Sequence, residues 1–253
     1  MASYRIARPG LVLAAAAFLA ACGISPPDPQ RVPLAQQVPR FSRGLLGAEV
    51  PDGWRVWTIH PGKTRTRYEL VALDGERVLR ADADASASGL MVDLSVDPAE
   101  MPILTFRWRT DALIAGADAT QAHASDSPVR VMLAFDGDKS ALPLKDRLTF
   151  ERVRLLSGRE MPYATLVYIW ENRLAVDTVQ PNLHTGRIRK MVASSGAGAV
   201  GRWQSFRRDI VADYKRAFGE PPGRLVGVGV MSDTDNTRQR VRAYYGDIQL
   251  HAR

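Results

Sequence analysis

The stretch TRYELVALDGERVLRAD (residues 66–82) decides the class of the fold. It consists of two runs with the character of β-strands on either side of the dipeptide Asp74-Gly75. Asp-Gly is a strong signal for a two-residue turn between antiparallel strands. We therefore expect a β-hairpin in this part of the chain.

Strand patterns continue along the rest of the chain, at residues 54–60, 88–97, 103–111, 129–138, 164–172, 187–196, 201–209, 224–233 and 241–252. Helical patterns are scarce. One helix is expected near residues 210–218, with Asp209 as its N-cap and Gly219 as its stop, and another within residues 144–158. About ten strands without regular βα alternation predict an all-β fold. We expect an antiparallel β-sandwich of jelly-roll type with one or two short helices.

The first residues have the pattern of a bacterial export signal. Arg5 and Arg8 precede an apolar run at residues 11–20, which is too short to cross a bilayer. The sequence Leu19-Ala20-Ala21-Cys22 follows and resembles a lipobox, in which the cysteine is acylated and becomes the mature N-terminus. An ordinary secreted protein with an incidental cysteine is the alternative. Gly23 stands where the lipoproteins that this segment resembles carry an aspartate for inner-membrane retention, so we expect the outer membrane, facing the periplasm.

These features divide the chain into three parts. Residues 1–21 form the expected signal peptide, and residues 22–45 form the lipidated cysteine with a proline-rich tether. Residues 46–253 form a single β-sandwich domain, because no internal repeat or second linker appears. Cys22 is the only cysteine, so an internal disulfide is excluded and the apolar core must supply the stability.

The net charge of +7 is too weakly patterned to indicate nucleic acid as a partner. No run of basic residues resembles a nucleic-acid motif, and an envelope location argues against such a ligand. The partners that we expect are the membrane, through the N-terminal lipid, and a glycan or an envelope protein.

Known catalytic signatures are missing from the sequence. It contains no G-x-S-x-G elbow, H-E-x-x-H motif or P-loop, and the scattered histidines show no metal-ligand spacing. Paired carboxylates are harder to dismiss, because the separation of two acids across a sugar depends on the fold. The candidates for such a pair are Asp126, Glu171, Asp233 and Asp235.

Two strand segments combine an apolar face with a face of mixed character. In residues 164–172 the mixed face contains Tyr168, Trp170 and Asn172, and in residues 129–138 it contains Arg130. Aromatic rings next to hydrogen-bonding groups suit sugar rings, which stack on the aromatic face while their hydroxyls meet polar side chains. The alternative is that Tyr168 and Trp170 cover the core at the edge of the sandwich.

The segment MSDTDNT (residues 231–237) follows a strand in which glycines at 227 and 229 leave one face bare. Glycine within a strand often marks the close approach of another segment, and we expect the helix near residues 210–218 to cover this face. Asp233, Asp235 and Asn236 can form a turn, a ligand-binding rim or a calcium loop. The glycine and the distal glutamate of an EF-hand are missing, so the turn is the first expectation, and no cofactor is expected except calcium as a weak alternative.

Several segments together resemble the bacterial family DUF3047, whose function is unassigned. They are SASGL (86–90), FRWRT (106–110), SPVRVMLAFDG (127–137), ATLVYIWEN (164–172), Trp203 with Asp209, DYKRAFGE (213–220), MSDTDNT (231–237) and YYGDIQL (244–250). The resemblance implies an exported protein with a jelly-roll fold of the galactose-binding-like type, and it supplies no catalytic residues. Residues 123–126 depart from the pattern, since only Asp126 is acidic where acids are expected to cluster.

The sequence thus predicts a lipid-anchored envelope domain that binds a carbohydrate or another envelope component without catalysis. The predicted ligand-binding residues are Asp126, Arg130, Tyr168, Trp170, Asn172, Asp233, Asp235 and Asn236. Two alternatives stay open, namely a hydrolase or lyase acting on polysaccharide through paired carboxylates, and an assembly lipoprotein that binds a protein partner.

Overall fold

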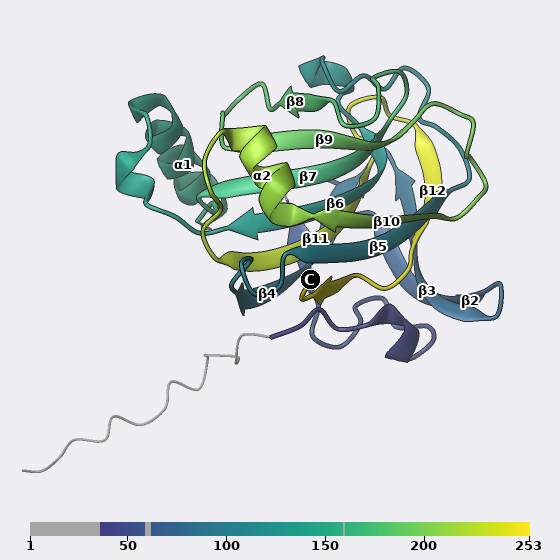
Figure 1. The fold of residues 1–253 in the computed structure, drawn as a ribbon. Helices are drawn as coiled ribbons and strands as arrows, with labels where there is room; N and C mark the ends of the chain where they lie inside the picture. Colours follow the sequence, from purple (N-terminus) through teal and green to yellow (C-terminus); the bar gives the residue numbers. More distant parts are fainter. Residues whose placement is uncertain (1–35, 59–61, 159) are drawn as a thin grey trace, which may run out of the picture. The chain divides into compact units, whose positions relative to one another are not determined.

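The computed structural model describes residues 36–58, 62–158 and 160–253. Most of these residues form β-strands arranged in two sheets (Figure 1). Cys22, the expected signal residues 1–21 and most of the expected tether lie outside the described residues. The described part belongs to one compact unit, Leu34–Arg253.

Seven strands of the described chain form the first sheet, in the order β1 (Arg55–Thr58), β4 (Ala87–Val96), β11 (Leu225–Asp233), β6 (Ser127–Phe135), β7 (Ala164–Glu171), β9 (Ile188–Ser195) and β8 (Val179–Pro181). All neighbours in this sheet are antiparallel except β7 and β9, which run parallel.

Six described strands form the second sheet. Its order is β10 (Gln204–Asp209), β5 (Ile103–Thr110), β12 (Arg240–Tyr245), β3 (Glu76–Asp84) and β2 (Arg67–Leu73), and β13 (Gln249–His251) pairs with β5 beside β12. All of these pairs are antiparallel. The predicted all-β jelly-roll sandwich is therefore confirmed.

The hairpin at residues 66–82 has the expected turn. Strands β2 and β3 pair from Leu73 and Glu76 outward, with Asp74 and Gly75 between them. Both turn residues have positive φ, at 53° and 80°, which is the backbone of a type I′ turn and explains the Asp-Gly dipeptide.

Two α-helices accompany the sheets in the described chain, as expected: α1 (Leu144–Ser157) and α2 (Ile210–Phe218). The carboxylate of Asp209 caps α2 by accepting hydrogen bonds from the backbone N–H groups of Val211 and Ala212, both at 3.0 Å. The helix ends at Gly219, whose φ of 76° is the left-handed conformation of a C-terminal glycine. Short 3₁₀ turns occur at Phe41–Arg43, Ala122–Ala124 and Lys139–Ala141.

The expected boundary between tether and domain at residue 45 is wrong. Val38 and Phe41 belong to the buried core, and the ring of Phe41 stacks on Trp54 with a centroid separation of 4.8 Å. Ser42 also donates to Asp247 near the C-terminus. Proline-rich composition predicted a linker, but two apolar side chains in this segment find a place on the sandwich, and their burial outweighs the local signal.

The strand β7 directs its aromatic side chains into the core, which agrees with the alternative left open by the sequence and not with a ligand-binding face. Tyr168 and Trp170 are 0% and 1% exposed and face the second sheet, where the ring of Phe106 lies 5.4 Å from that of Tyr168. The indole Nε1 of Trp170 donates to the carbonyl of Gly196 at 3.0 Å. These two residues are therefore core residues, and neither can serve as a stacking platform for a sugar.

Register explains this error. Val131 of β6 lies beside Tyr168, and Val131 faces the core, so Tyr168 must face it as well. Arg130, which is next to Ile169 in the same register, points to the outer face of the seven-stranded sheet, as predicted. Both faces of β7 are apolar, so the alternation within the strand did not reveal which face is internal.

The glycine face of β11 is covered by methionine side chains, whereas we expected the helix near residues 210–218 to cover it. A Cβ on Gly229 would lie 2.9 Å from the terminal carbon of Met91 and 3.0 Å from that of Met132. These methionines belong to the neighbouring strands β4 and β6, and their methyl groups occupy the space that the glycine leaves. Helix α2 packs elsewhere, with Tyr214 edge-on to Phe135 at 4.7 Å.

Candidate functional site

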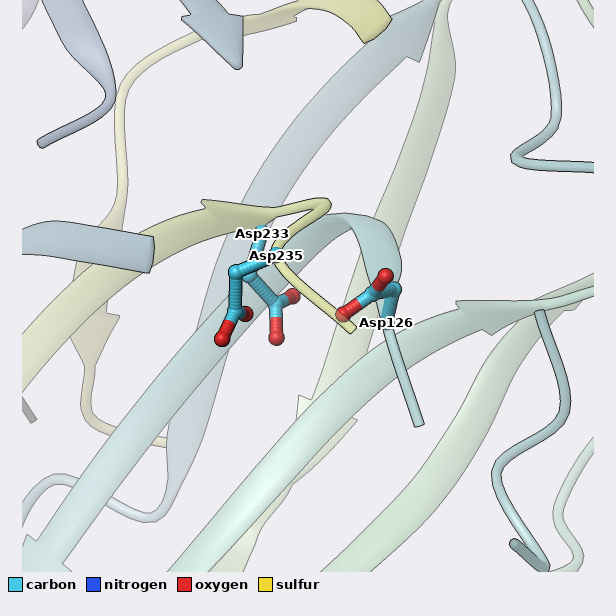
Figure 2. Close-up of side chains that lie close together, drawn as sticks. All are labelled: Asp126, Asp233 and Asp235. Carbon is cyan, nitrogen blue, oxygen red and sulfur yellow. The ribbon is translucent and has the colours of Figure 1, made fainter. Parts of the chain in front are cut away.

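The structure brings most of the predicted site residues together at one end of the seven-stranded sheet. Asp126, Asp233 and Asp235 each offer a carboxylate oxygen, and these oxygens all lie within 4.8 Å of one another (Figure 2). Asp233 ends β11, Asp235 follows it, and Asp126 immediately precedes β6. We call these three residues with Arg130 and Lys63 the acidic cluster.

Arg130 and Asp233 form the centre of this cluster. Nε and Nη2 of the guanidinium donate to the two carboxylate oxygens of Asp233, both at 2.7 Å, and Nη2 also donates to the carbonyl of Ser125 at 2.5 Å. The side chains of Arg130 and Asp233 are only 9% and 7% exposed. Burial raises the pKa of the Asp233 carboxyl, while the adjacent Arg130 opposes this rise.

Asp126 holds the MSDTDNT segment in place. Its carboxylate accepts hydrogen bonds from the backbone N–H groups of Asn236 and Thr237, at 3.3 and 2.7 Å, and from the Thr237 hydroxyl at 2.7 Å. The segment connects β11 to β12, so its interpretation as a turn is confirmed. The side-chain oxygens that hold the turn come from Asp126, while Asp233 and Asp235 bond to Arg130 and Lys63 outside the segment.

The side-chain oxygens of the acidic cluster are not arranged to hold a calcium ion. Arg130 occupies both oxygens of Asp233, Lys63 is paired with Asp235, and Asp126 accepts three hydrogen bonds. The side-chain amide of Asn236 donates to the carbonyl of Ala122 at 2.6 Å. Calcium needs six to eight oxygen ligands, and these groups already have their partners within the protein.

Glu171 and Asn172, the other polar candidates at the end of β7, stabilise loops. The Glu171 carboxylate accepts hydrogen bonds from the backbone N–H groups of Arg173 and Leu174 at 2.5 and 2.6 Å. The Asn172 amide donates to the carbonyls of Ile114 and Ala117 at 2.9 and 3.0 Å. Among the described carboxylates that we considered as a catalytic pair, each is thus engaged by neighbouring donors.

Lys190 lies near the acidic cluster and was not predicted from the sequence. It is 5% exposed, and no described carboxylate lies within ion-pair distance of its ammonium group. Burial is the main cause that lowers its pKa to about 8, with a further contribution from the charge of Arg130. Nothing in strand 187–196 marked this lysine as internal, because its position depends on the parallel pairing of β9 with β7.

A second polar surface lies on the outer face of the six-stranded sheet. The guanidinium of Arg107 lies 4.7 Å from the ring centre of Trp203, and that of Arg109 lies 5.6 Å from the ring centre of Tyr244. The indole Nε1 of Trp203 donates to Asp74 at 3.2 Å. We call these five residues the aromatic–arginine surface.

A hollow of about 400 Å³ adjoins this surface through Arg107, which lines it. Its other polar lining residues are Ser42, Glu76, Arg77, Thr105, Ser205, Asp247 and Gln249. The hollow lies where β5 changes partner from β12 to β13, and its lining includes Ser42 near the start of the described residues and Gln249 near the C-terminus. Its volume falls within the usual range of small-molecule sites, about 300–1,000 Å³.

The aromatic–arginine surface was missed because its parts are far apart in the sequence. Alternation along residues 103–110 does place Arg107 and Arg109 on one face. Their aromatic partners come from the segments before β10 and within β12, and only the order of the sheet brings them together.

The sequence profile of the family described as "Protein of unknown function (DUF3047)" matches residues 52–249, which is most of the chain. The chain belongs to this family. The expected membership of DUF3047 is therefore confirmed, and the match spans both sheets, the acidic cluster and the aromatic–arginine surface. No curated protein matches the sequence.

Solved structures with a similar fold include carbohydrate-active proteins. A family 11 carbohydrate-binding module from Clostridium thermocellum, in complex with a mixed-linked tetrasaccharide, has 11% identity and a TM-score of 0.41, over 86% of this chain and 95% of that one. The K1 adhesin domain of Lys-gingipain from Porphyromonas gingivalis W83 has 11% identity and a TM-score of 0.39, over 87% and 99%.

The xyloglucanase domain of NopAA from Sinorhizobium fredii, in complex with cellobiose, has 7% identity and a TM-score of 0.41, over 80% of this chain and 93% of that one. Likeness at this level says nothing about the ligand of this chain.

Among the described residues, no helix has the length and apolar character needed to cross a membrane.

Proposed function

We propose that this chain is a non-catalytic, lipid-anchored domain of the bacterial cell envelope that binds a carbohydrate or another envelope component. The binding site is the aromatic–arginine surface with its adjoining hollow. This assignment replaces Tyr168 and Trp170, which are buried, by Trp203, which is partly exposed. The anchor is Cys22, and the domain faces the periplasm from the outer membrane.

The observation that carries the proposal is the position of Arg107. Its guanidinium lies over the ring of Trp203 and also lines the hollow, so an aromatic ring and a polar depression form one continuous surface. Sugars present both an apolar C–H face and a set of hydroxyl groups, and such a surface supplies partners for both.

The acidic cluster supports binding over hydrolysis. A general acid or nucleophile must reach the substrate, but Asp233 is 5% exposed and holds Arg130 through both oxygens. Asp126 is equally buried at 5% exposure and is occupied by the turn that it stabilises. The arrangement is that of a structural network, in which every acid has a partner.

The test is binding to a panel of cell-wall, capsular and lipopolysaccharide glycans, measured by calorimetry with wild-type protein and with Trp203→Ala. We expect Trp203→Ala to weaken binding roughly ten-fold or more, because a central aromatic contact at an interface contributes about 2 kcal/mol. The matched control is Trp57→Ala, which removes a half-buried tryptophan from the seven-stranded sheet. We expect this variant to bind the glycan as the wild type does. Equal loss in both variants, or none in either, would overturn the proposed site.

Catalysis is tested on the same glycans by measuring product release. We expect no turnover by the wild-type chain. Turnover by the wild-type chain would show that it is an enzyme, and its loss in Asp235→Asn with unfolding unchanged would place the acidic cluster in the active site.

The proposed anchor is tested by fractionating bacteria that express the full chain. Wild-type protein is expected in the outer-membrane fraction, and the Cys22→Ser variant is expected to lose the lipid modification, as measured by mass spectrometry of the N-terminal peptide. An unmodified wild-type cysteine would show that the lipobox interpretation is wrong.

A further inference from the structure

Helix α1 is apolar on the side that faces away from the rest of the domain. Leu144, Leu148 and Leu155 are 66%, 61% and 78% exposed, and their spacing of four and seven residues puts them on one face. Leu156, at 62%, borders this face. Four of the nine large exposed hydrophobic residues in the described chain thus lie on a single helix, which makes them a patch.

The other side of α1 attaches the helix to the domain. Asp146 is buried and accepts hydrogen bonds from the Thr185 hydroxyl at 2.7 Å and from the backbone N–H of Gly186 at 3.2 Å. Phe150, one turn later, is 8% exposed. Figure 1 shows α1 standing at the side of the sandwich. The leucine stripe therefore points outward because its opposite face is already occupied.

Positive charge surrounds this stripe. Lys145, Arg147 and Arg152 are exposed and form no ion pair with a described carboxylate, while the exposed acid Glu151 is paired with Arg154 at 2.7 Å. A shallow depression on the same face is lined by Leu144, Leu148 and Arg152, together with Lys145 and Thr149. The surface therefore combines exposed leucines with uncompensated basic groups.

We propose that α1 is a membrane-docking surface that places its leucines between the headgroups of an anionic bilayer. Exposed apolar side chains flanked by lysine and arginine are the chemistry of interfacial helices, and anionic headgroups supply the charge that the three basic residues lack. A protein partner would have to supply both an apolar surface and at least an equal number of acids.

The predicted anchor gives the helix access to such a surface. Cys22 precedes the first described residue, Gln36, by a segment that spans at most about 50 Å when fully extended. The lipid attaches the chain to the bilayer at one point, and a second attachment on the domain itself fixes which face of the domain meets the bilayer. Helix α1 provides that second attachment, and the aromatic–arginine surface, being a different face, stays a separate binding site.

The experiment uses the full chain with Cys22→Ser and Leu148→Cys, so that the new thiol is the only one, labelled with an environment-sensitive fluorophore. Vesicles contain a lipid-borne quencher and either phosphatidylglycerol with phosphatidylethanolamine, or phosphatidylcholine alone. We expect a blue shift and quenching in the anionic vesicles. Both are expected to be lost when Lys145→Glu and Arg152→Glu are added. The N-terminal residues are common to all variants, so differences between them report on α1.

The matched control carries the fluorophore at Arg240→Cys, on an exposed side chain of β12, where no quenching is expected. Equal quenching at both positions, or no quenching at position 148 in anionic vesicles, would overturn the proposal. Shielding of the fluorophore at 148 only after addition of an envelope protein fraction would also overturn it, because the helix would then bind a protein.

Discussion

Asp233 accepts two hydrogen bonds from the guanidinium of Arg130, at 2.7 Å each, in a part of the sandwich from which water is almost excluded. Ser127 adds a backbone N–H to the same carboxylate at 3.1 Å. The pair joins β6 to β11 on the outer face of the seven-stranded sheet. Buried charges are tolerated only when they are paired in this way, so the two residues depend on each other.

The first prediction concerns this pair. Asp233→Asn is expected to lower the free energy of unfolding by about 3–5 kcal/mol, because the buried guanidinium of Arg130 would lose the carboxylate that is paired with it. Urea denaturation measures the change. The control is Asp84→Asn, which breaks an exposed pair with Arg240 and should cost less than about 1 kcal/mol. A similar small effect of Asp233→Asn would contradict the structural role that we assign to the pair.

The second prediction concerns calcium. Added calcium and added chelator are both expected to leave the melting temperature unchanged, because Arg130 and Lys63 neutralise the carboxylates that an ion would need. An ion that binds only the folded state raises the melting temperature by mass action. A rise with calcium that is absent in Asp235→Asn would show that the ion displaces Lys63, and our interpretation of the cluster would then be wrong.

The third prediction is a pH dependence that arises from Lys190. Its pKa is lowered to about 8 in the folded state, mainly by burial, from 10.5 for the unperturbed side chain. Between these values the unfolded chain binds more protons than the folded one, so this residue makes stability rise with pH. Below pH 8 the charged lysine destabilises the fold by roughly 3 kcal/mol, and the penalty disappears as the pH approaches 10.5.

Comparison with Lys190→Met measures this effect, because other titrating groups cancel between the two proteins. We expect the variant to be the more stable protein below pH 8 and its advantage to shrink as pH rises towards 10.5. An advantage that stays constant over this range would show that Lys190 has the same protonation in the folded and unfolded chains.

The fourth prediction separates core tryptophans from surface ones. Trp170→Ala is expected to destabilise the fold by about 3–5 kcal/mol, because it leaves a large cavity between the sheets. Trp203→Ala, at a partly exposed position, should cost much less. Thermal or urea unfolding of both variants provides the measurement. If Trp170→Ala instead reduced glycan binding with full stability, the exposed stacking role that we rejected would have to be restored.

Local signals predicted the elements whose formation depends on neighbouring residues. The Asp74-Gly75 turn and the cap of α2 at Asp209 both form as expected, because positive φ and helix capping are properties of short segments. The connection at MSDTDNT was also predicted, since Asp and Asn favour turns. Its attachment to Asp126 was not, because 110 residues separate Asp126 from Asn236.

The sequence named most residues of the acidic cluster as ligand-binding, and it named as such none of the aromatic–arginine surface that we propose as the binding site. Arg130, Asp126 and Asp233 were named from residue type and strand alternation, and they meet at the acidic cluster. The opposite outcome for Tyr168 shows the limit of that reasoning. Alternation states which residues share a face, but when both faces are apolar it does not state which face meets the other sheet.

The sequence by itself determined the sandwich class, the hairpin turn, the two helices and membership of DUF3047, because each rests on short-range patterns or on the ordered set of family segments. Only the tertiary structure decided that Tyr168 and Trp170 are internal, that Lys190 is buried near Arg130, and that Trp203 lies beside Arg107. The physical reason is that burial and long-range contact depend on strand register and sheet order, which join residues far apart in the chain.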